Sequence, residues 1–318
     1  MLDNSILIDE PLYPKEVMHP WEEALFQTSY LRRLKHLAHY GAGALVSPVV
    51  HSRFEHTLGV WRLTARYFPE NDLIRVAAIL HDIGHLPFSH ALESALGFNH
   101  HQLTEAYICD PEITNILAEI NILPQDVIDY LNGPSPLTGT AEVMGLDHLD
   151  SFLRDTYMAG QIKILPRKLL EKIRCNESGV VTDEETGCQL LELIYLDHQL
   201  FLSPLLMAAD QLLIEAVKQE LANSTKHGLA LLTDAELLSI LYRSDQKQVN
   251  QYVALLTRKP DQIKISHDLS AQGIPLKVRK LYQKTPLCMG QPLSKSEKAQ
   301  PVMQALAALK RDYQLLVS

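Results

Sequence analysis

The sequence predicts an all-α fold with a helical core, a mostly helical C-terminal region and one small β-hairpin. Two observations carry this prediction. Strong helix formers and apolar residues at helical spacing run through most of the 318 residues. A single stretch, residues 175–185 (CNESGVVTDEE), instead combines turn-forming residues with apolar ones, which is typical of a hairpin.

The expected helices follow the apolar periodicity along the chain. They cover residues 25–39, 54–68, 72–80, 104–118, 124–131, 141–158, 166–173, 189–218, 235–242, 245–257 and 301–316. Pro204 is expected to interrupt the longest of them, because an interior proline removes a backbone hydrogen bond and clashes with the preceding turn. Residues 259–298 are polar and contain prolines, so no helix is expected there.

The length suits one large domain, or a core with an appendage. We expect an N-terminal extension at residues 1–24, a core at 25–160, and a C-terminal region at 161–318 that completes the fold or mediates oligomerisation. The boundary is placed near Gly160 because histidines crowd before it and the hairpin follows it.

Composition and charge narrow the classes of function and location. The net charge is −9, so the chain has no general electrostatic attraction to nucleic acid or to an anionic membrane. The one basic cluster, residues 277–284 (KVRKLYQK), is short, which makes a nucleic-acid partner the least favoured. Four cysteines without a CxxC pair indicate free thiols. Acidic residues at the N-terminus and the lack of a long apolar stretch favour a cytoplasmic protein without a membrane partner.

Histidines are concentrated in one part of the chain. Nine of the 14 lie between His36 and His101, so this region is the first candidate for a functional site. Three segments stand out: HSRFEHTLGV at 51–60, LHDIGHLPFSH at 80–90 and LDHLDSFLRD at 146–155.

These segments contain the residue types of a metal site. Imidazole and carboxylate together suit Mn, Fe, Co, Ni, Zn or Mg-like ions. His81 and Asp82 are adjacent at a predicted helix end, His56 lies early in another helix, and Asp147 could approach from a third side. Two histidines and two carboxylates leave room for water and a phosphate oxygen, and a cation there can polarise a phosphorus–oxygen bond.

The third segment has a helical geometry of its own. Asp147, Ser151 and Asp155 are spaced by four residues and therefore share one helix face. Asp150 and Arg154 are also four apart and can pair, which on a surface would contribute only ~0.3–0.5 kcal/mol.

At these segments the chain resembles the HD-domain superfamily, in particular the branch with bacterial dGTP triphosphohydrolases and the vertebrate SAM-and-HD-domain dNTP triphosphohydrolase. That family carries RFEHSLGV, HDxGHxPFSH and a DxDRxDYxxRD helix; residues 53–60, 81–90 and 147–155 match them in order. The resemblance covers roughly residues 20–160. A second His-Asp dipeptide, His267-Asp268, lies in a polar stretch without these neighbours.

The resemblance implies a role for each matching residue. The implied metal ligands are His56, His81, Asp82 and Asp147; the implied catalytic residues are His85, His90, His101 and Glu93; the implied substrate-binding residues are Arg53, Asp155, Ser151, His39 and His148. Within these sets, Arg53 would contact phosphate, His101 would act near the leaving group, and Asp155 would contact a sugar.

Some positions depart from the family pattern. His148 stands where the family has Lys or Arg, Ser151 where it has Tyr, His39 where it has Gln, and Glu93 where it has Asp. The metal ligands thus match while the nucleoside-reading positions differ. The resemblance implies a metal-dependent phosphohydrolase that cleaves a phosphoester or phosphoanhydride of a nucleotide-like substrate, with dNTPs as one candidate.

Two alternatives remain open at this point. One is a phosphatase or phosphodiesterase that acts on another small phosphoester, and the other is a non-catalytic regulator that binds a nucleotide. A homo-oligomer, either a dimer or a higher even assembly, is also expected. Apolar helices such as residues 200–213 and 229–241 exceed the needs of one core, and the family often forms such assemblies.

Overall fold

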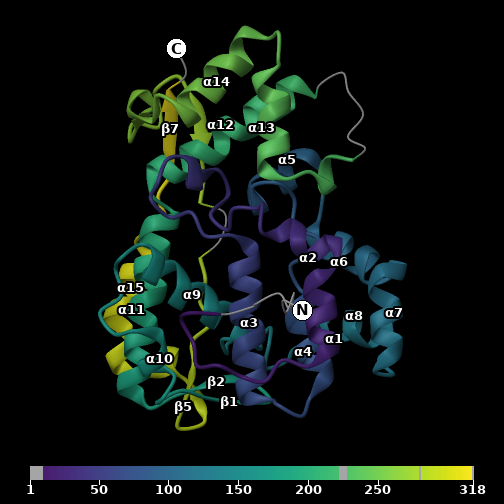
Figure 1. The fold of residues 1–318 in the computed structure, drawn as a ribbon. Coiled ribbons are helices and arrows are strands. Elements are labelled where there is room, and N and C mark those ends of the chain that lie inside the picture. Colours follow the sequence, from purple (N-terminus) through teal and green to yellow (C-terminus); the bar gives the residue numbers. More distant parts are fainter. Residues whose placement is uncertain (1–9, 222–227, 279–280, 317–318) are drawn as a thin grey trace.

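The computed structural model describes residues 10–221, 228–278 and 281–316 and is mostly helical (Figure 1). The helices are α1 Pro20–Gln27, α2 Ser29–Leu34, α3 Arg53–Tyr67, α4 Asp72–Leu80, α5 Glu93–Leu96, α6 His100–Ile108, α7 Pro111–Glu119, α8 Pro124–Asn132, α9 Leu146–Met158, α10 Pro166–Leu169, α11 Glu184–Phe201, α12 Pro204–Glu220, α13 Asp234–Tyr242, α14 Lys247–Thr257 and α15 Gln300–Ala307. The strands are β1 Arg174–Asn176, β2 Gly179–Val181, β3 Lys264–Ser266, β4 Ile274–Leu276, β5 Leu287–Cys288, β6 Gln291–Pro292 and β7 Tyr313–Leu316. Short 3₁₀ turns include η1 Gly41–Leu45 and η2 Ser89–Leu92.

Helix α3 lies at the centre of the molecule and packs against α4 and α9 (Figure 1). Its start is fixed by a capping box, in which the Ser52 hydroxyl accepts from the Glu55 backbone N–H and the Glu55 carboxylate accepts from the Ser52 N–H. Almost every α3 side chain from Arg53 to Ala65 is buried, polar ones included. The helix therefore brings its histidine and arginine into the interior rather than to solvent.

Three groups of elements surround α3, and each has its own apolar core (Figure 1). Helices α1, α2, α4, α7 and α8 bury residues such as Phe26 and Trp61. Helices α12, α13 and α14 pack with the sheet that contains β7. Helices α9, α11 and α15 share the third core, where Leu149 packs in the same cluster as Leu190. This third core combines residues from both sides of Gly160, and the division of the chain there stays a prediction.

Two small sheets accompany the helices. One has the order β1-β2-β5-β6 and contains the predicted hairpin, with Cys175 opposite Val180. The other has the order β3-β7-β4, in which β7 is central and pairs antiparallel with both neighbours. Its strands lie in segments that the sequence assigned to no structure or to a helix. The predicted helix at 301–316 is therefore wrong beyond Ala307, because residues 313–316 alternate buried and half-buried side chains in a strand.

Other differences concern helix boundaries. The predicted helix at 25–39 is two helices that separate at Thr28, whose side chain caps α2. The predicted helix at 104–118 is divided before Pro111, which begins α7 at a position where its missing N–H costs nothing. The predicted helix at 141–158 begins only at Leu146, after the extended Gly145. The interruption at Pro204 is confirmed, since α11 ends at Phe201 and Pro204 begins α12.

Within residues 10–221, 228–278 and 281–316, no single helix combines the length and the low polarity that crossing a bilayer requires. Helices α11 and α12 meet that requirement only when taken together, and they bend by 51° where they join.

Candidate metal centre

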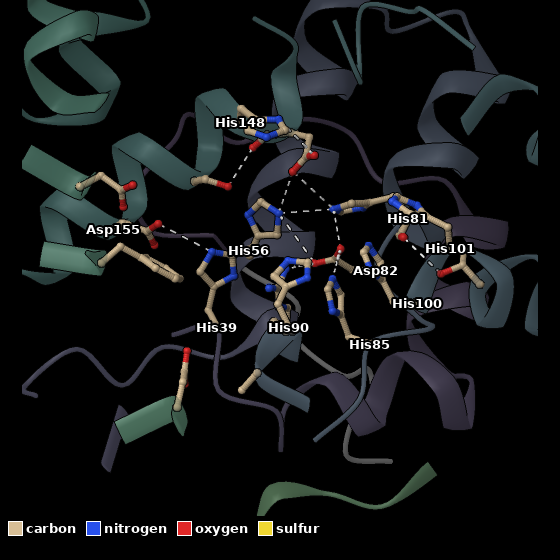
Figure 2. Close-up of a pocket in the computed structure, with 18 of the residues that line it drawn as sticks. His39, His56, His81, Asp82, His85, His90, His100, His101, His148 and Asp155 are labelled. Carbon is tan, nitrogen blue, oxygen red and sulfur yellow. Dashed lines mark hydrogen bonds and ion pairs between the residues drawn. The ribbon is translucent and has the colours of Figure 1, made fainter. Parts of the chain in front are cut away.

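The four residues predicted as metal ligands lie close together, and Figure 2 shows three of them, His56, His81 and Asp82, side by side. His56 lies in the first turn of α3, His81 and Asp82 follow the end of α4, and Asp147 lies in the first turn of α9. His56 Nε2 is 3.0 Å from Asp147 Oδ1 and 3.3 Å from His81 Nε2. Asp82 Oδ1 is 3.5 Å from His81 Nε2, and Asp82 Oδ2 is 3.8 Å from His56 Nε2. A cation bound at ~2.0–2.2 Å by nitrogen and oxygen ligands needs separations of this size.

The two imidazole rings are oriented for coordination. His56 Nδ1 lies 2.8 Å from Asp150 Oδ2, and His81 Nδ1 lies 2.8 Å from the Ala78 carbonyl oxygen. A carboxylate and a carbonyl can only accept, so both Nδ1 atoms carry the proton and donate it. Each Nε2 then presents its lone pair to the cluster, as in metal-bound histidines whose other nitrogen is held by an acceptor.

The electrostatics of the cluster call for a positive charge. Burial opposes the charged form of His56, yet hydrogen bonds to Asp147 and Asp150 raise its pKa to about 9. Burial also opposes a charged Asp82, but the neighbouring His81 and Arg53 side chains hold the pKa of that carboxyl well below its usual range. Two imidazoles and two carboxylates thus surround a point that favours positive charge. This donor set fits a divalent cation.

A buried network behind His56 holds its ring in place. Asp150 Oδ1 accepts from the Tyr13 hydroxyl at 2.7 Å, and both Asp150 oxygens accept from Arg154 at 3.0 Å. Arg154 also donates to Glu10 at 2.7 Å, and all of these side chains are buried. Asp150 and Arg154 do pair as the spacing predicts, but the pair is buried inside the protein and does not lie on its surface. Glu10 and Tyr13 could not be identified from the sequence, since only the fold brings a segment 137 or more residues away against α9.

Replacing Asp150 with asparagine should weaken metal binding by roughly 10–100-fold, because the acceptor that polarises and orients His56 loses its charge. Isothermal titration with Mn²⁺ measures the affinity, and Asp261→Asn, an exposed change outside the network, is the matched control. Circular dichroism should show that the variant is folded. An unchanged Mn²⁺ affinity in folded Asp150→Asn would contradict this role for Asp150.

Arg53 is held beside the candidate ligands. Its Nη1 donates to Asp82 Oδ2 at 2.8 Å and its Nε donates to Ser89 Oγ at 2.8 Å. His85 Nε2 lies 3.0 Å from Asp82 Oδ1 on the same side, and burial lowers the pKa of His85 well below its usual range. Arg53 therefore supplies a fixed cation at this end of the cavity, while His85 is neutral.

Glu93 contacts two histidines, and one of them, His100, is not among the catalytic residues that the resemblance implies. Its Oε1 is 2.7 Å from His90 Nδ1 and its Oε2 is 2.9 Å from His100 Nδ1. His101, the residue predicted to act near the leaving group, lines the cavity with its ring 4.0 Å from that of His100. The two histidines are equivalent in the sequence. The phase of α6, which begins at His100, decides which of them faces Glu93.

The substrate-binding candidates line the same cavity as the candidate ligands. The cavity has a volume of about 720 Å³, and its walls include Arg53, His39, Ser151, His148, Asp155, His85, His90 and His101, together with the four candidate ligands. Ser151 Oγ donates to the Asp147 carbonyl oxygen at 3.4 Å. The ring of His148 stacks on Tyr282 at 4.3 Å, a residue that sequence reasoning did not single out. The C-terminal region completes the walls with Asp210, Gln211 and Lys277.

Comparison with protein families supports the sequence motifs. Residues 53–137 match the model of the HD domain. A metal-dependent phosphohydrolase of Cordyceps militaris is 30% identical over 172 residues, which cover 50% of this chain and 48% of that protein. A deoxynucleoside triphosphate triphosphohydrolase of Bos taurus is 31% identical over 106 residues, 29% of this chain and 18% of that protein.

A solved structure resembles almost the whole chain. It is a hypothetical protein from Aquifex aeolicus with a TM-score of 0.69 and 23% identity, and the match covers 95% of this chain and 96% of that one. This similarity concerns the fold. The chain spans about half the length of the curated relatives it matches first.

Proposed function

We propose that the chain, whose residues 53–137 match the HD-domain model, is a metal-dependent phosphohydrolase that cleaves a phosphoester or phosphoanhydride of a nucleotide-like substrate. One observation carries this proposal. The four candidate ligands, a buried arginine and a group of histidines all line a single cavity large enough for a small molecule. The cavity wall carries six carboxylates against Arg53 and Lys277, so an anionic substrate would depend on a bound cation and on Arg53 for its charge partner.

The candidate ligands His56, His81, Asp82 and Asp147 would hold a divalent cation such as Mn, Fe, Co, Ni, Zn or Mg. Such a cation would polarise a phosphorus–oxygen bond and make hydroxide available near neutral pH by lowering the pKa of water. Arg53 would bind phosphate oxygens, because Asp82 and Ser89 already hold its guanidinium in place at the cavity.

Protonation of the leaving group falls to the histidines around Glu93. The Glu93 carboxylate accepts from Nδ1 of His100 and so leaves Nε2 of that ring to exchange a proton with the substrate. The same carboxylate orients His90, whose side chain is 57% exposed at the cavity. We therefore assign the proton donor to His100, with Glu93 as the positioning residue. His101 is the alternative that the motif alignment suggests.

Replacing His100 with alanine should lower kcat by roughly 10²–10⁴-fold, the usual contribution of a general acid or base. His101→Ala is the matched comparison one residue away and should lower kcat less than about tenfold, because no side-chain hydrogen bond to Glu93 depends on it. Steady-state kinetics with added Mn²⁺ measure both. A larger loss of kcat in His101→Ala than in His100→Ala would assign the proton donor to His101 instead.

Within nucleotides, we propose deoxynucleoside triphosphates as the first substrates to test. The name of the Bos taurus relative supports this choice. His39, Ser151 and His148 stand at positions where the related family reads the nucleoside, and all three line the cavity. These three residue types differ from those of the family. The experiment must therefore also be able to detect cleavage of substrates with a different nucleotide-like leaving group.

The test is hydrolysis by the purified full chain, stripped with a chelator and resupplied with Mn²⁺, against nucleotides and other phosphoesters. Turnover should require the metal and should be lost in His81→Gln. Inorganic triphosphate as product identifies a triphosphohydrolase, and orthophosphate identifies a phosphatase. Tight nucleotide binding without turnover at any metal would replace the enzyme with a regulator. No turnover and no binding would overturn the proposal.

A further inference from the structure

A second cluster of buried histidine and carboxylate side chains lies beside the candidate metal centre. His39 and His51 flank the segment that contains η1, and the His39 N–H donates to the His51 carbonyl oxygen at 3.0 Å, which fixes the two residues side by side. Asp155 reaches them from α9, two turns beyond Asp147. All three are buried, with exposed fractions of 6%, 2% and 2%.

The polar atoms of this cluster are arranged as ligands. His51 Nε2 is 2.8 Å from Asp155 Oδ1, and His39 Nε2 is 3.7 Å from Asp155 Oδ2. The two rings stack with their centroids 5.0 Å apart. Each of the three residues offers one ligand atom, and these atoms all lie within 4.8 Å of one another. One cation can therefore reach all three.

Several of these atoms lack hydrogen bonds. Among the residues that the structure describes, both ring nitrogens of His51, Nδ1 of His39 and Oδ1 of Asp155 have no hydrogen-bond partner. The 2.8 Å approach of His51 to Asp155 is close but is not aligned as a hydrogen bond. A buried polar atom without a partner is costly, and native proteins usually satisfy it with water or an ion.

A further carboxylate adds negative charge at the same place. Asp197 is buried, accepts from the Tyr40 hydroxyl at 3.2 Å, and lies within hydrogen-bond reach of Asp155. Two carboxyl groups so close cannot both be ionised without a compensating positive charge. A divalent cation on Asp155 would supply that charge.

We propose that His39, His51 and Asp155 form a second divalent-cation site, separate from the one at His56. Two imidazoles and a carboxylate favour Mn, Fe, Co, Ni or Zn. The ring of His39 lies 4.7 Å from that of His56, so the two sites are neighbours along one wall of the cavity. His39 and Asp155 line the cavity, whereas His51 is not part of its wall.

The experiment counts ions per chain. The purified full chain is stripped with a chelator, loaded with excess Mn²⁺, desalted and measured by inductively coupled plasma mass spectrometry. Wild type should retain two ions per chain. His51→Gln and Asp155→Asn should each retain one, and so should His81→Gln, which removes the other site. His267→Gln, an exposed histidine outside both clusters, should retain two.

Anomalous diffraction from wild-type crystals grown with Mn²⁺ gives a second measurement that does not depend on any variant folding. A peak between His39, His51 and Asp155 supports the proposal. A wild-type protein that holds one ion, with no anomalous peak at this cluster, overturns it. Two ions retained in folded His51→Gln and Asp155→Asn also overturn it. Because His81→Gln tests the other site separately, hydrolysis at His56 can be supported while the second ion is rejected.

Discussion

Replacing His81 with glutamine should lower kcat/KM for phosphate hydrolysis by at least about 10³-fold, which corresponds to about 4 kcal/mol of transition-state stabilisation. His81 Nε2 faces His56 Nε2 at 3.3 Å and Asp82 Oδ1 at 3.5 Å, so its loss removes one of four candidate ligands from the centre of the cluster. Glutamine is close in size but offers no imidazole lone pair. Its folding cost should be small because His81 ends α4 and faces the cavity.

The chain contains its own control for this prediction. His267 precedes Asp268 in the same order as His81 precedes Asp82, but it is exposed and lies against Tyr313, in the sheet of β3, β4 and β7. His267→Gln should keep wild-type kcat/KM and metal content. Equal activity of His81→Gln and wild type under saturating Mn²⁺ would show that hydrolysis does not depend on this cluster.

Replacing Gly59 with alanine should destabilise the protein by about 2–4 kcal/mol. A Cβ at this position would overlap Asp150 Oδ1 and an Arg154 nitrogen, so the buried pair must separate. Disrupting a buried ion pair costs about 3–5 kcal/mol, while alanine in a helix recovers about 1 kcal/mol relative to glycine. Urea denaturation measures the free energy of unfolding. Metal affinity should also fall, since Asp150 orients His56.

A second glycine isolates the steric effect. Gly133 follows α8 in an extended conformation, and a Cβ there would meet only the Asp129 carbonyl oxygen at 3.3 Å. Gly133→Ala should change the free energy of unfolding by less than about 1 kcal/mol. If Gly59→Ala were as stable as Gly133→Ala, then α3 and α9 would have to accommodate the extra methyl group by moving apart. The packing described for Asp150 would then be wrong.

The sequence predicted a helix well where the residues that cap it lie next to its ends in the chain. Helix α4 agrees with the predicted residues 72–80, and α3 begins one residue before its predicted start because Ser52 and Glu55 cap it. The sheet of β3, β4 and β7 could not be predicted in the same way. Its central strand, at 313–316, pairs with residues about 40 to 50 positions earlier in the chain. Without those partners, a segment of only four residues cannot be told from the end of the preceding helix.

The candidate ligands were also predictable, whereas their supporting residues were not. His56, His81, Asp82 and Asp147 stand in three segments whose residue types and order already indicate metal chemistry, and the fold brings them together. The resemblance implies a catalytic role for His101, whereas its neighbour His100 is the one that contacts Glu93. Neighbouring residues in a helix point in directions about 100° apart, and sequence cannot fix that phase at a helix start.

By itself the sequence determined the all-α class and indicated the candidate metal ligands and the chemistry that they would favour, because these depend on residue type and short spacing. Only the tertiary structure decided which groups surround those donors. Glu10 and Tyr13 meet Arg154 and Asp150, and His51 meets Asp155, across more than 100 positions of the chain. Contacts of this kind arise when the apolar cores pack separate helices together. The same packing buries both ring nitrogens of His51 without a hydrogen-bond partner, which costs free energy.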